Sequence, residues 1–395
     1  MKMKRSIIHI LFVLPFLLLL GCVEDKMTPL NKGDQAPAPV SDVEVERLPG
    51  GAILSYSLPR DKNILYVKAV YEIRKGVERE VKSSYYKNYL QIDGFPDTAT
   101  YQVKLYAVSR GEELSEPVTV AVTPLTPPVR SVFETLTLQE TFGGVRISFE
   151  NDSEAKIVLT VLAQDSTGDF VPAETFYTER LKGNFSARGF APEPKRFGVF
   201  VRDRWNNHSD TLFSDLTPWF ERELDKSKFR EVLFPSDTYE GHVGSRLSNL
   251  WNGLTGHGGG EIFHTKPGTG LPQWFTFDLG VTTVLSRFRL HHRDGNADGP
   301  YTGGDPYIYE IYGSNEPSDD WESWTLLTTC QSVKPSGSGP QVTTEDKEFA
   351  VVQGEDFDFP PGIPPVRYLR FKIEKVWGPL DHHYIAELTF WGGEE

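Results

Sequence analysis

The sequence predicts an all-β chain built from several domains. Apolar and polar residues alternate in short runs, which is typical of antiparallel strands with one buried face. The 395 residues include 35 glycines, 28 prolines and only 3 methionines, and this composition favours turns and short strands over long helices. A chain of 395 residues is also longer than one domain usually is, so two or three domains are expected.

The first residues are interpreted as a targeting signal that lies outside the fold. Lys2, Lys4 and Arg5 precede an apolar run at residues 7–20. This run is shorter than the roughly 20 residues that a membrane-spanning helix needs. Residues 1–21 are therefore predicted to be a signal peptide.

Residues 19–22, Leu-Leu-Gly-Cys, resemble the lipobox of bacterial lipoproteins. The resemblance implies that Cys22 carries the lipid anchor, and several acyl chains hold a protein on a membrane because each buried methylene contributes about 0.8 kcal/mol. Glu24 and Asp25 resemble the surface-export signal of Bacteroidetes-type lipoproteins, which implies an outer-membrane protein facing the cell exterior. Residues 22–40 show no periodicity and are predicted to be a tether.

Residues 41–125 are predicted to form a first β-sandwich. Half-buried strands are expected at 52–56, 65–71 and 101–108, with polar turns between them. The run from Leu90 through the strand that starts at Tyr101 resembles a fibronectin type III domain, which implies an immunoglobulin-like sandwich.

A second copy of this pattern follows the first. Gly-Gly-Ala-Ile-Leu-Ser-Tyr at 50–56 is echoed by Gly-Gly-Val-Arg-Ile-Ser-Phe at 143–149, so residues 128–218 are predicted to be a second sandwich of the same class. Neither copy gathers His, Asp or Glu in one turn, and both are interpreted as spacers. In the linker at 219–231, the apolar residues Phe220, Leu224 and Phe229 predict one short amphipathic helix.

The last part of the chain, residues 232–395, resembles a discoidin-like domain, the coagulation-factor C-type jelly roll. The segments that carry the resemblance lie at 273–280, 285–293, 307–315, 366–371 and 386–392. The order of tether, two sandwiches and jelly roll also resembles a family of Bacteroidetes lipoproteins built from domains of unknown function and found beside glycan-uptake genes. This resemblance implies carbohydrate handling at the outer surface and an outer-membrane uptake complex as a partner.

Ligand chemistry is expected on the loops at one end of the jelly roll. Sugars stack their CH faces on aromatic rings, while their hydroxyl groups form directional hydrogen bonds with Asp, Asn, Arg and His. Three loops carry such residues: the first runs over residues 293–306, the second contains Trp377 and residues 381–383, and the third contains Trp251, Asn252 and His257. His291 and His292 precede the first loop on a strand that sends them to opposite faces. The predicted ligand-binding residues are Trp251, Arg293, Asp294, Asn296, Tyr301, Trp377, His382 and His383. The tryptophans in strand patterns, Trp274, Trp324 and Trp391, are assigned to the core.

Discoidin-like domains often hold a structural calcium ion, and the resemblance implies which residues would bind it here. Asn252 stands in place of the usual aspartate, Thr255 is the nearest candidate for the usual threonine, and Glu387 matches the glutamate of the last strand. An amide in place of a carboxylate weakens such a site. The sequence leaves open both a weak calcium site and a domain without a metal, and no cofactor is required.

Several classes of function are disfavoured. The net charge is −14 and no basic block follows the first residues, so nucleic acid and anionic membrane surfaces are poor partners, and the lipid is the expected membrane contact. The 2 cysteines cannot form a thiolate zinc cluster. The sequence contains no glycine-rich phosphate loop, no Gly-x-Ser-x-Gly elbow and no His-Glu-x-x-His motif. Each segment is also assigned to a small β-domain, which leaves no enzyme-sized stretch, so no enzyme activity is expected.

Three hypotheses for function remain. The first is a surface lipoprotein that binds carbohydrate through its jelly roll as an accessory to glycan capture and uptake. The second is a structural lipoprotein that docks on an outer-membrane uptake complex through its sandwiches. The third is a cryptic glycoside hydrolase, because acidic residues are numerous enough to supply a carboxylate pair.

Overall fold

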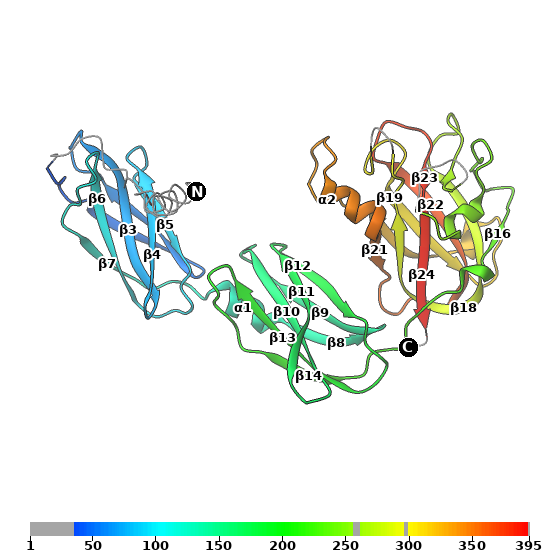
Figure 1. The fold of residues 1–395 in the computed structure, drawn as a ribbon, viewed down its shortest axis with the longest axis horizontal. Helices are drawn as coiled ribbons and strands as arrows, with labels where there is room; N and C mark the ends of the chain where they lie inside the picture. Colours follow the sequence, from blue (N-terminus) through cyan, green and yellow to red (C-terminus); the bar gives the residue numbers. More distant parts are fainter. Residues whose placement is uncertain (1–34, 256–260, 296–298, 394–395) are drawn as a thin grey trace, which may run out of the picture. The chain divides into compact units, whose positions relative to one another are not determined.

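The computed structural model describes residues 35–255, 261–295 and 299–393. This part of the chain consists almost entirely of strands and turns, which confirms the prediction of an all-β protein (Figure 1). Its contacts define two compact units, residues up to 131 with 203–208, and residues 132–202 with 209–395. In the described ranges, the helices are all too short or too polar to cross a membrane. The predicted anchor Cys22 lies outside the described residues.

The first sandwich consists of two antiparallel sheets over one core. The sheets have the strand orders β1-β2-β5 and β4-β3-β6-β7. Leu54 of one sheet and Val67 and Leu105 of the other are fully buried in the shared core. The strands are β1 (Ser41–Leu48), β2 (Gly51–Ser57), β3 (Ile64–Arg74), β4 (Val77–Ser84), β5 (Tyr89–Asp93), β6 (Tyr101–Ser109) and β7 (Val118–Val122).

The second sandwich repeats the strand order of the first. Its sheets are β12-β9-β8 and β11-β10-β13-β14, which correspond one to one with β5-β2-β1 and β4-β3-β6-β7. The repeated sequence pattern therefore corresponds to a repeated topology. Its elements are α1 (Pro128–Thr135), β8 (Thr137–Thr141), β9 (Gly144–Glu150), β10 (Ile157–Gln164), β11 (Phe170–Thr178), β12 (Lys182–Arg188), β13 (Lys195–Asp203) and β14 (Leu212–Leu216).

The repeated Gly-Gly pair has a local physical reason. Gly50 and Gly143 have φ angles of +63° and +64°, a region that side chains rarely adopt. A Cβ atom on the second glycine of each pair would lie 2.4 Å from the carbonyl oxygen of Ile92 or 1.8 Å from that of Ala187. Both sandwiches thus need two glycines at the same turn, one for its conformation and one for close packing.

The C-terminal domain is a sandwich in which one strand belongs to both layers. The 19-residue strand β18 (Gln273–His291) pairs with β16 and β22 through its first part and with β21 and β24 through its second. The register shifts between Asp278 and Thr283, where Gly280 has a φ of +71°. This bend lets β18 belong to both sheets of the domain.

The remaining elements of this domain form the two layers and the loops at their ends (Figure 1). Its other strands are β15 (Arg222–Glu223), β16 (Arg230–Val232), β17 (Phe263–His264), β19 (Pro306–Ser314), β20 (Thr325–Gln331), β21 (Glu355–Asp358), β22 (Val366–Val376), β23 (Tyr384–Ile385) and β24 (Glu387–Gly393). Its short helices are η2 (Lys226–Lys228), η3 (Leu247–Trp251), η4 (Trp321–Ser323), α2 (Thr344–Lys347) and η5 (Glu348–Gln353).

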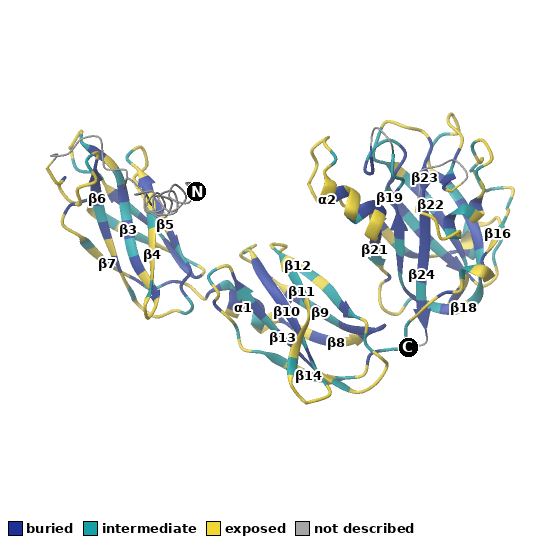
Figure 2. Ribbon diagram, viewed as in Figure 1, coloured by how far each residue is buried: buried dark blue, intermediate teal, exposed yellow. Residues whose placement is uncertain are grey.

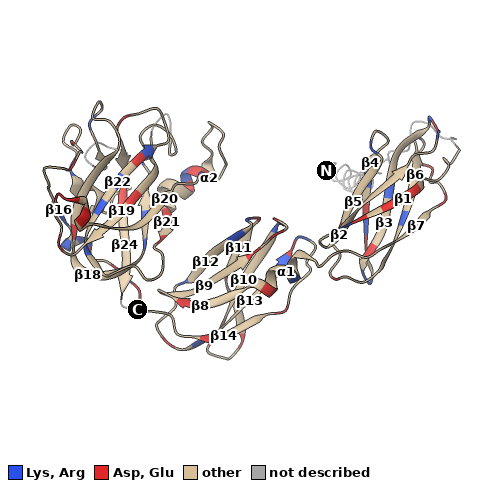
Figure 3. Ribbon diagram, turned by 180° about the vertical axis from the view of Figure 1, so that it is seen from behind, with Lys and Arg blue, Asp and Glu red and all other residues tan. Residues whose placement is uncertain are grey.

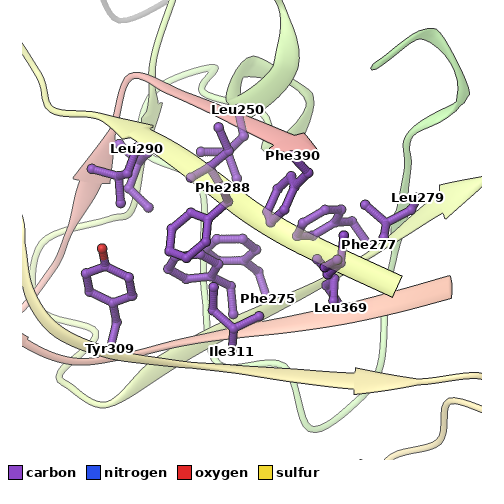
Figure 4. Close-up of a cluster of buried hydrophobic side chains, with 14 of the residues drawn as sticks. Leu250, Phe275, Phe277, Leu279, Phe288, Leu290, Tyr309, Ile311, Leu369 and Phe390 are labelled. Carbon is purple, nitrogen blue, oxygen red and sulfur yellow. The ribbon is translucent and has the colours of Figure 1, made fainter. Parts of the chain in front are cut away.

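Aromatic rings fill the core between these layers. Phe288 lies among them, with ring centroids 5.1 Å from Phe357 and 5.7 Å from Phe390 (Figure 4). Phe275 stacks on Phe371 from the opposite strand at 5.5 Å. Figure 2 shows the buried positions along these strands and the exposed positions in the loops. A Phe to Ala change in such a core typically costs about 3–5 kcal/mol of stability, so packing dominates the stability of the domain.

The segment at 219–231 differs from the predicted amphipathic helix. β15 pairs with β24, and Leu224 and Phe229 are only 3% and 2% exposed in the jelly-roll core. Phe220 is 49% exposed, so the three apolar residues do not share one helical face. The edge of β24 supplies hydrogen-bond partners to the backbone of residues 222–224, and the segment is helical only in the single turn η2. From Arg222 onward the predicted linker is therefore part of the jelly roll.

The prediction that three tryptophans lie in the core is correct for one of them. Trp324 is 6% exposed. Trp274 and Trp391 are only half-buried, because both lie on outward-facing strand positions. The Trp391 ring is covered by the guanidinium of Arg287, whose Cζ lies 3.9 Å from the ring centroid, and Trp274 packs at 5.3 Å against Trp321.

Ion pairs on the surface contribute less than this core. Figure 3 shows Lys and Arg positions interspersed with Asp and Glu positions along the strands. Arg289 contacts Asp356 at 2.6 Å and Arg367 contacts Asp278 at 2.8 Å. Partly exposed pairs of this kind typically contribute about 0–1 kcal/mol each.

Candidate functional site

Three histidines meet at one end of the jelly roll. β17 pairs with β23, and this pairing places His264 opposite Tyr384. The ring centroid of His264 lies 5.2 Å from that of His382 and 5.0 Å from that of His242. Arg293 lies at the same place, with its guanidinium Cζ 4.9 Å from the centroid of the Tyr384 ring. We call His242, His264, His382, Tyr384 and Arg293 the histidine cluster.

Burial and neighbouring positive charges keep the imidazole of His264, the central residue of this cluster, neutral. Burial lowers the pKa of His264 to about 4, and the neighbouring charges of His382, His242 and Arg293 act in the same direction. The Nδ1 atom of His264 lies 2.7 Å from the carbonyl oxygen of Thr265, which can only accept, so Nδ1 donates this hydrogen bond. Nε2 of His264 is therefore an acceptor at neutral pH.

The histidine cluster also contains hydrogen-bond donors. The Nε atom of Arg293 is buried and has no hydrogen-bond partner among the described residues. Nδ1 of His382 lies 3.2 Å from a carboxylate oxygen of Asp381, which also accepts a hydrogen bond from the backbone N–H of Gly268 at 3.1 Å. These two contacts lower the pKa of Asp381. A neutral acceptor and a cationic donor thus lie together at the end of the fold, which suits recognition of hydroxyl groups.

The first and second of the predicted ligand loops are joined by backbone hydrogen bonds. The backbone N–H of Trp377 donates to Asp305 at 3.0 Å, that of Gly378 to Gly303 at 2.7 Å, and that of Tyr384 to Gly304 at 3.1 Å. A Cβ atom on Gly304 would lie 2.8 Å from the carbonyl oxygen of His382. This close approach brings Arg293 and His382, both named from the sequence, into one cluster.

Tyr301 and Trp377 lie behind these loops. Tyr301 is 5% exposed and packs against Trp377 and His292, with ring centroids at 5.3 Å and 4.9 Å. Trp377 is half-buried and also packs against Tyr307 at 4.7 Å. The two predicted residues therefore support the loops through packing, and Trp377 presents only part of its ring to solvent.

The other predicted residues lie outside the histidine cluster or are not described. Trp251 packs against Phe229 and Phe277 at the edge of the core. His383 is fully buried, and burial lowers its pKa to about 3. Asp294 is half-buried in the first loop, and Asn296 lies outside the described residues.

Sequence reasoning missed His242, His264 and Tyr384. His264 and Tyr384 come from two-residue strands that are too short to show a periodic pattern. The backbone N–H of His242 donates to the carbonyl oxygen of His264 at 2.8 Å, which joins a third segment to this pair. The only signal in the sequence is the concentration of histidines in this domain, and the pairing of β17 with β23 cannot be derived from that signal.

A buried polar network holds the first loop from below. His292 is fully buried, with Nδ1 3.3 Å from a carboxylate oxygen of Asp305 and Nε2 3.2 Å from one of Glu355. Burial opposes the charge on His292, but its interactions with the two carboxylates outweigh it and raise its pKa to about 9. Ser332 lies 3.3 Å from Nε2 and is 1% exposed. Although Ser, His and Asp line up here, the serine is closed to solvent and the imidazole is held as a cation, so this network is structural.

Comparison with known proteins identifies the family. A solved structure of a SusE-like protein is 33% identical to this chain and has a TM-score of 0.44. The match covers 67% of this chain and 99% of the SusE-like protein. The chain belongs to the SusE-like family. Three models of domains of unknown function match it, DUF4959 at 37–124, DUF5126 at 125–227 and DUF5000 at 251–392.

Other solved structures are more distant from this SusE-like chain. The C-terminal domain of a chitobiase from Bacteroides fragilis is 17% identical and has a TM-score of 0.30. The match covers 44% of this chain and 98% of the chitobiase domain. A two-domain fibronectin type III segment of chicken tenascin is 14% identical, with coverages of 45% and 99% and a TM-score of 0.23. No curated protein sequence matches the chain significantly.

The residues expected to bind calcium do not form a fitting donor set in this SusE-like chain. The side-chain oxygen of Asn252 accepts a hydrogen bond from the backbone N–H of Leu254 at 2.7 Å, and its amide nitrogen donates to the carbonyl oxygen of Glu261 at 2.8 Å. Among the described residues, no group of three or more His, Cys, Asp or Glu side chains is placed to hold a metal ion. Calcium prefers six to eight oxygen ligands, and Glu387 is the only carboxylate of the predicted set.

Proposed function

We propose that this SusE-like chain is an outer-surface lipoprotein that binds carbohydrate through its C-terminal jelly roll, as an accessory to glycan capture and uptake. The observation that carries the proposal is the histidine cluster, which gathers a half-buried neutral acceptor, His264, beside the guanidinium of Arg293. Membership of the SusE-like family supports the proposed role.

The chemistry of the cluster matches that of a sugar. A pyranose presents adjacent hydroxyl groups that both donate and accept hydrogen bonds. The guanidinium of Arg293 donates to hydroxyl oxygens, and Nε2 of His264 accepts from a hydroxyl hydrogen. Hydrogen bonds that involve a charged group are about twice as strong as neutral ones, so Arg293 is the expected anchor of the ligand. No step in this proposal requires catalysis.

A glycan array probed with the full chain lacking residues 1–22 tests the proposal. Binding to a restricted set of oligosaccharides is expected, followed by calorimetry with the best ligand. The affinity of one copy is expected to be weak, because few ligand atoms are buried at an open loop site, and many copies on a cell add avidity. If no glycan binds the chain on the array or in solution at millimolar concentration, the proposed function is wrong.

A scaffolding role is the second candidate, and one observation favours it. Tyr86, in the turn between β4 and β5, is 82% exposed, and its ring lies 3.9 Å from that of Tyr85. Tyr89 at the start of β5 is 45% exposed. Exposed tyrosines are enriched in protein interfaces, so this end of the first sandwich could contact an uptake complex. Capture of an outer-membrane partner by the two sandwiches without any glycan binding would favour this role.

The lipid anchor gives a separate prediction. Because Cys22 is the residue that the lipobox resemblance assigns to the lipid, Cys22→Ser is expected to move the protein from the membrane fraction to the soluble fraction. Fractionation of cells labelled with a radioactive fatty acid measures both location and lipid. Cys330→Ser is the matched control, since this other cysteine is 5% exposed within the jelly-roll core. Label that remains on the Cys22→Ser protein would contradict the prediction.

A further inference from the structure

The start of β24 holds a buried carboxylate that already has a cation. The side chain of Glu387 is 3% exposed. One of its oxygens contacts Nζ of Lys226, and the other accepts a hydrogen bond from the backbone N–H of Gly253 at 3.2 Å. Nζ of Lys226 also donates to the hydroxyl of Thr389, two residues further along β24, at 2.7 Å.

Residues on both sides of Lys226 are fixed in the core, so the backbone that carries this side chain is held in place. Leu224, before it, donates its backbone N–H to the carbonyl oxygen of Phe390 at 2.9 Å, and Phe229, after it, is 2% exposed. The carboxylate of Asp225 caps the one-turn helix η2 by accepting from the backbone N–H of Ser227. The backbone is therefore already ordered, and only the lysine side chain loses conformational freedom when it contacts Glu387.

We propose that the Lys226 ammonium is the resident cation of this jelly roll and takes the place of a bound metal ion. One positive charge neutralises the only carboxylate of the predicted calcium set, and its N–H groups satisfy Glu387 and Thr389. This contact joins three parts of the domain, namely η2, the turn at Gly253 and β24. The fold thereby obtains from its own chain the crosslink that a calcium ion would give, and its stability is independent of calcium. The inference does not depend on the proposed function, because all of its tests measure stability.

The first test is thermal unfolding of the full chain in the presence of EDTA and then of excess calcium chloride. Tryptophan fluorescence follows the jelly roll, because most tryptophans of the chain lie in it, at Trp251, Trp274, Trp321, Trp324, Trp377 and Trp391. The unfolding midpoint is expected to be the same in both solutions. A rise of several degrees with calcium would overturn the proposal.

The second test removes the ammonium. Lys226→Met is expected to lower the unfolding midpoint by roughly 10 °C, because it leaves Glu387 buried without its partner. Lys228→Met in the same short helix is the matched control, since that ammonium is 60% exposed and lies 4.0 Å from Asp225. Its midpoint is expected to stay within about 2 °C of the wild type. Equal midpoints for the two single variants would overturn the proposal.

A double variant separates charge from packing. Adding Glu387→Gln to Lys226→Met removes the uncompensated charge. The double variant is therefore expected to regain about half of the decrease in unfolding midpoint that Lys226→Met causes. Failure of Glu387→Gln to recover any stability in this background would overturn the proposal. If Lys226→Met does not fold, the double variant and the calcium experiment still decide the question.

Discussion

Replacing His292 by glutamine is expected to destabilise the jelly roll by about 3–5 kcal/mol at pH 7, one of the largest effects that the structure predicts. The imidazole lies between the carboxylates of Asp305 and Glu355, which are 0% and 4% exposed. Glutamine cannot carry the charge, so two buried carboxylates would lose their cation. Asp305 also accepts from the backbone N–H groups of Arg293 and Thr302, and loss of the network would loosen the first loop.

The same network gives the stability of the domain a defined dependence on pH. The pKa of His292 is raised to about 9 in the fold, above the value of about 6.5 in an unfolded chain. A raised folded pKa stabilises the fold fully below pH 6.5, and this contribution is lost as the pH rises through about 9. The stability of the wild type is therefore expected to fall by roughly 3 kcal/mol across this window. Ser332 and Tyr301 also face the imidazole and do not neutralise it.

Chemical denaturation between pH 6 and 10 measures both effects. The free energy of unfolding of His292→Gln is expected to be lower than that of the wild type at pH 7. The two values are expected to converge above pH 9. His291→Gln is the matched control, because His291 is also buried but burial lowers its pKa and its Nδ1 faces the carbonyl oxygen of Val351. At alkaline pH, the free energy of unfolding of His291→Gln is expected to fall as steeply as that of the wild type. Parallel curves for His292→Gln and wild type would show that His292 carries no charge in the fold.

Much of this fold could be predicted from the sequence, because its strands follow local rules. Half-buried strands alternate apolar and polar residues, and the Gly-Gly pairs at Gly50 and Gly143 mark the same turn in both sandwiches. The segment after the second sandwich could not be predicted in this way. Phe220 and Leu224 have a helix-like spacing, but backbone pairing with β24 decides the conformation at residues 222–224. That partner lies far away in the sequence, and no local pattern contains it.

The candidate site was predictable only in its loop residues. Arg293 and His382 stand in loops with obvious ligand chemistry, and the structure brings both to His264. His264 itself lies on a two-residue strand, and its neighbour there is set by the pairing with Tyr384. The calcium set illustrates the same limit, because the resemblance to discoidin-like domains points to Glu387, while Lys226, its partner, comes from a segment assigned to a linker. In both cases a contact between distant segments decides the chemistry.

Replacing Arg293 by glutamine is expected to weaken glycan binding between tenfold and about a hundredfold. A hydrogen bond to a charged group contributes about 1.5–3 kcal/mol, and glutamine provides a shorter, neutral donor in its place. The guanidinium stacks on the Tyr384 ring, and its charge helps to lower the pKa of His264. Loss of the guanidinium therefore also changes the surroundings of His264, the main hydrogen-bond acceptor. The fold should tolerate this change, since the backbone N–H of residue 293 still donates to Asp305.

Calorimetry with the best ligand from the array measures this loss, with unfolding midpoints recorded on the same samples. Arg289→Gln is the matched control, because this arginine of β18 contacts Asp356 and the Trp391 ring instead of the histidine cluster. Its affinity is expected to equal that of the wild type. A second variant, His264→Ala, removes the neutral acceptor and is expected to weaken binding about tenfold, as loss of one well-placed hydrogen bond does. Unchanged affinity in both Arg293→Gln and His264→Ala would place any glycan site elsewhere on the chain. Loss of binding in Arg289→Gln as well would indicate a general effect of charge, because that side chain lies outside the cluster.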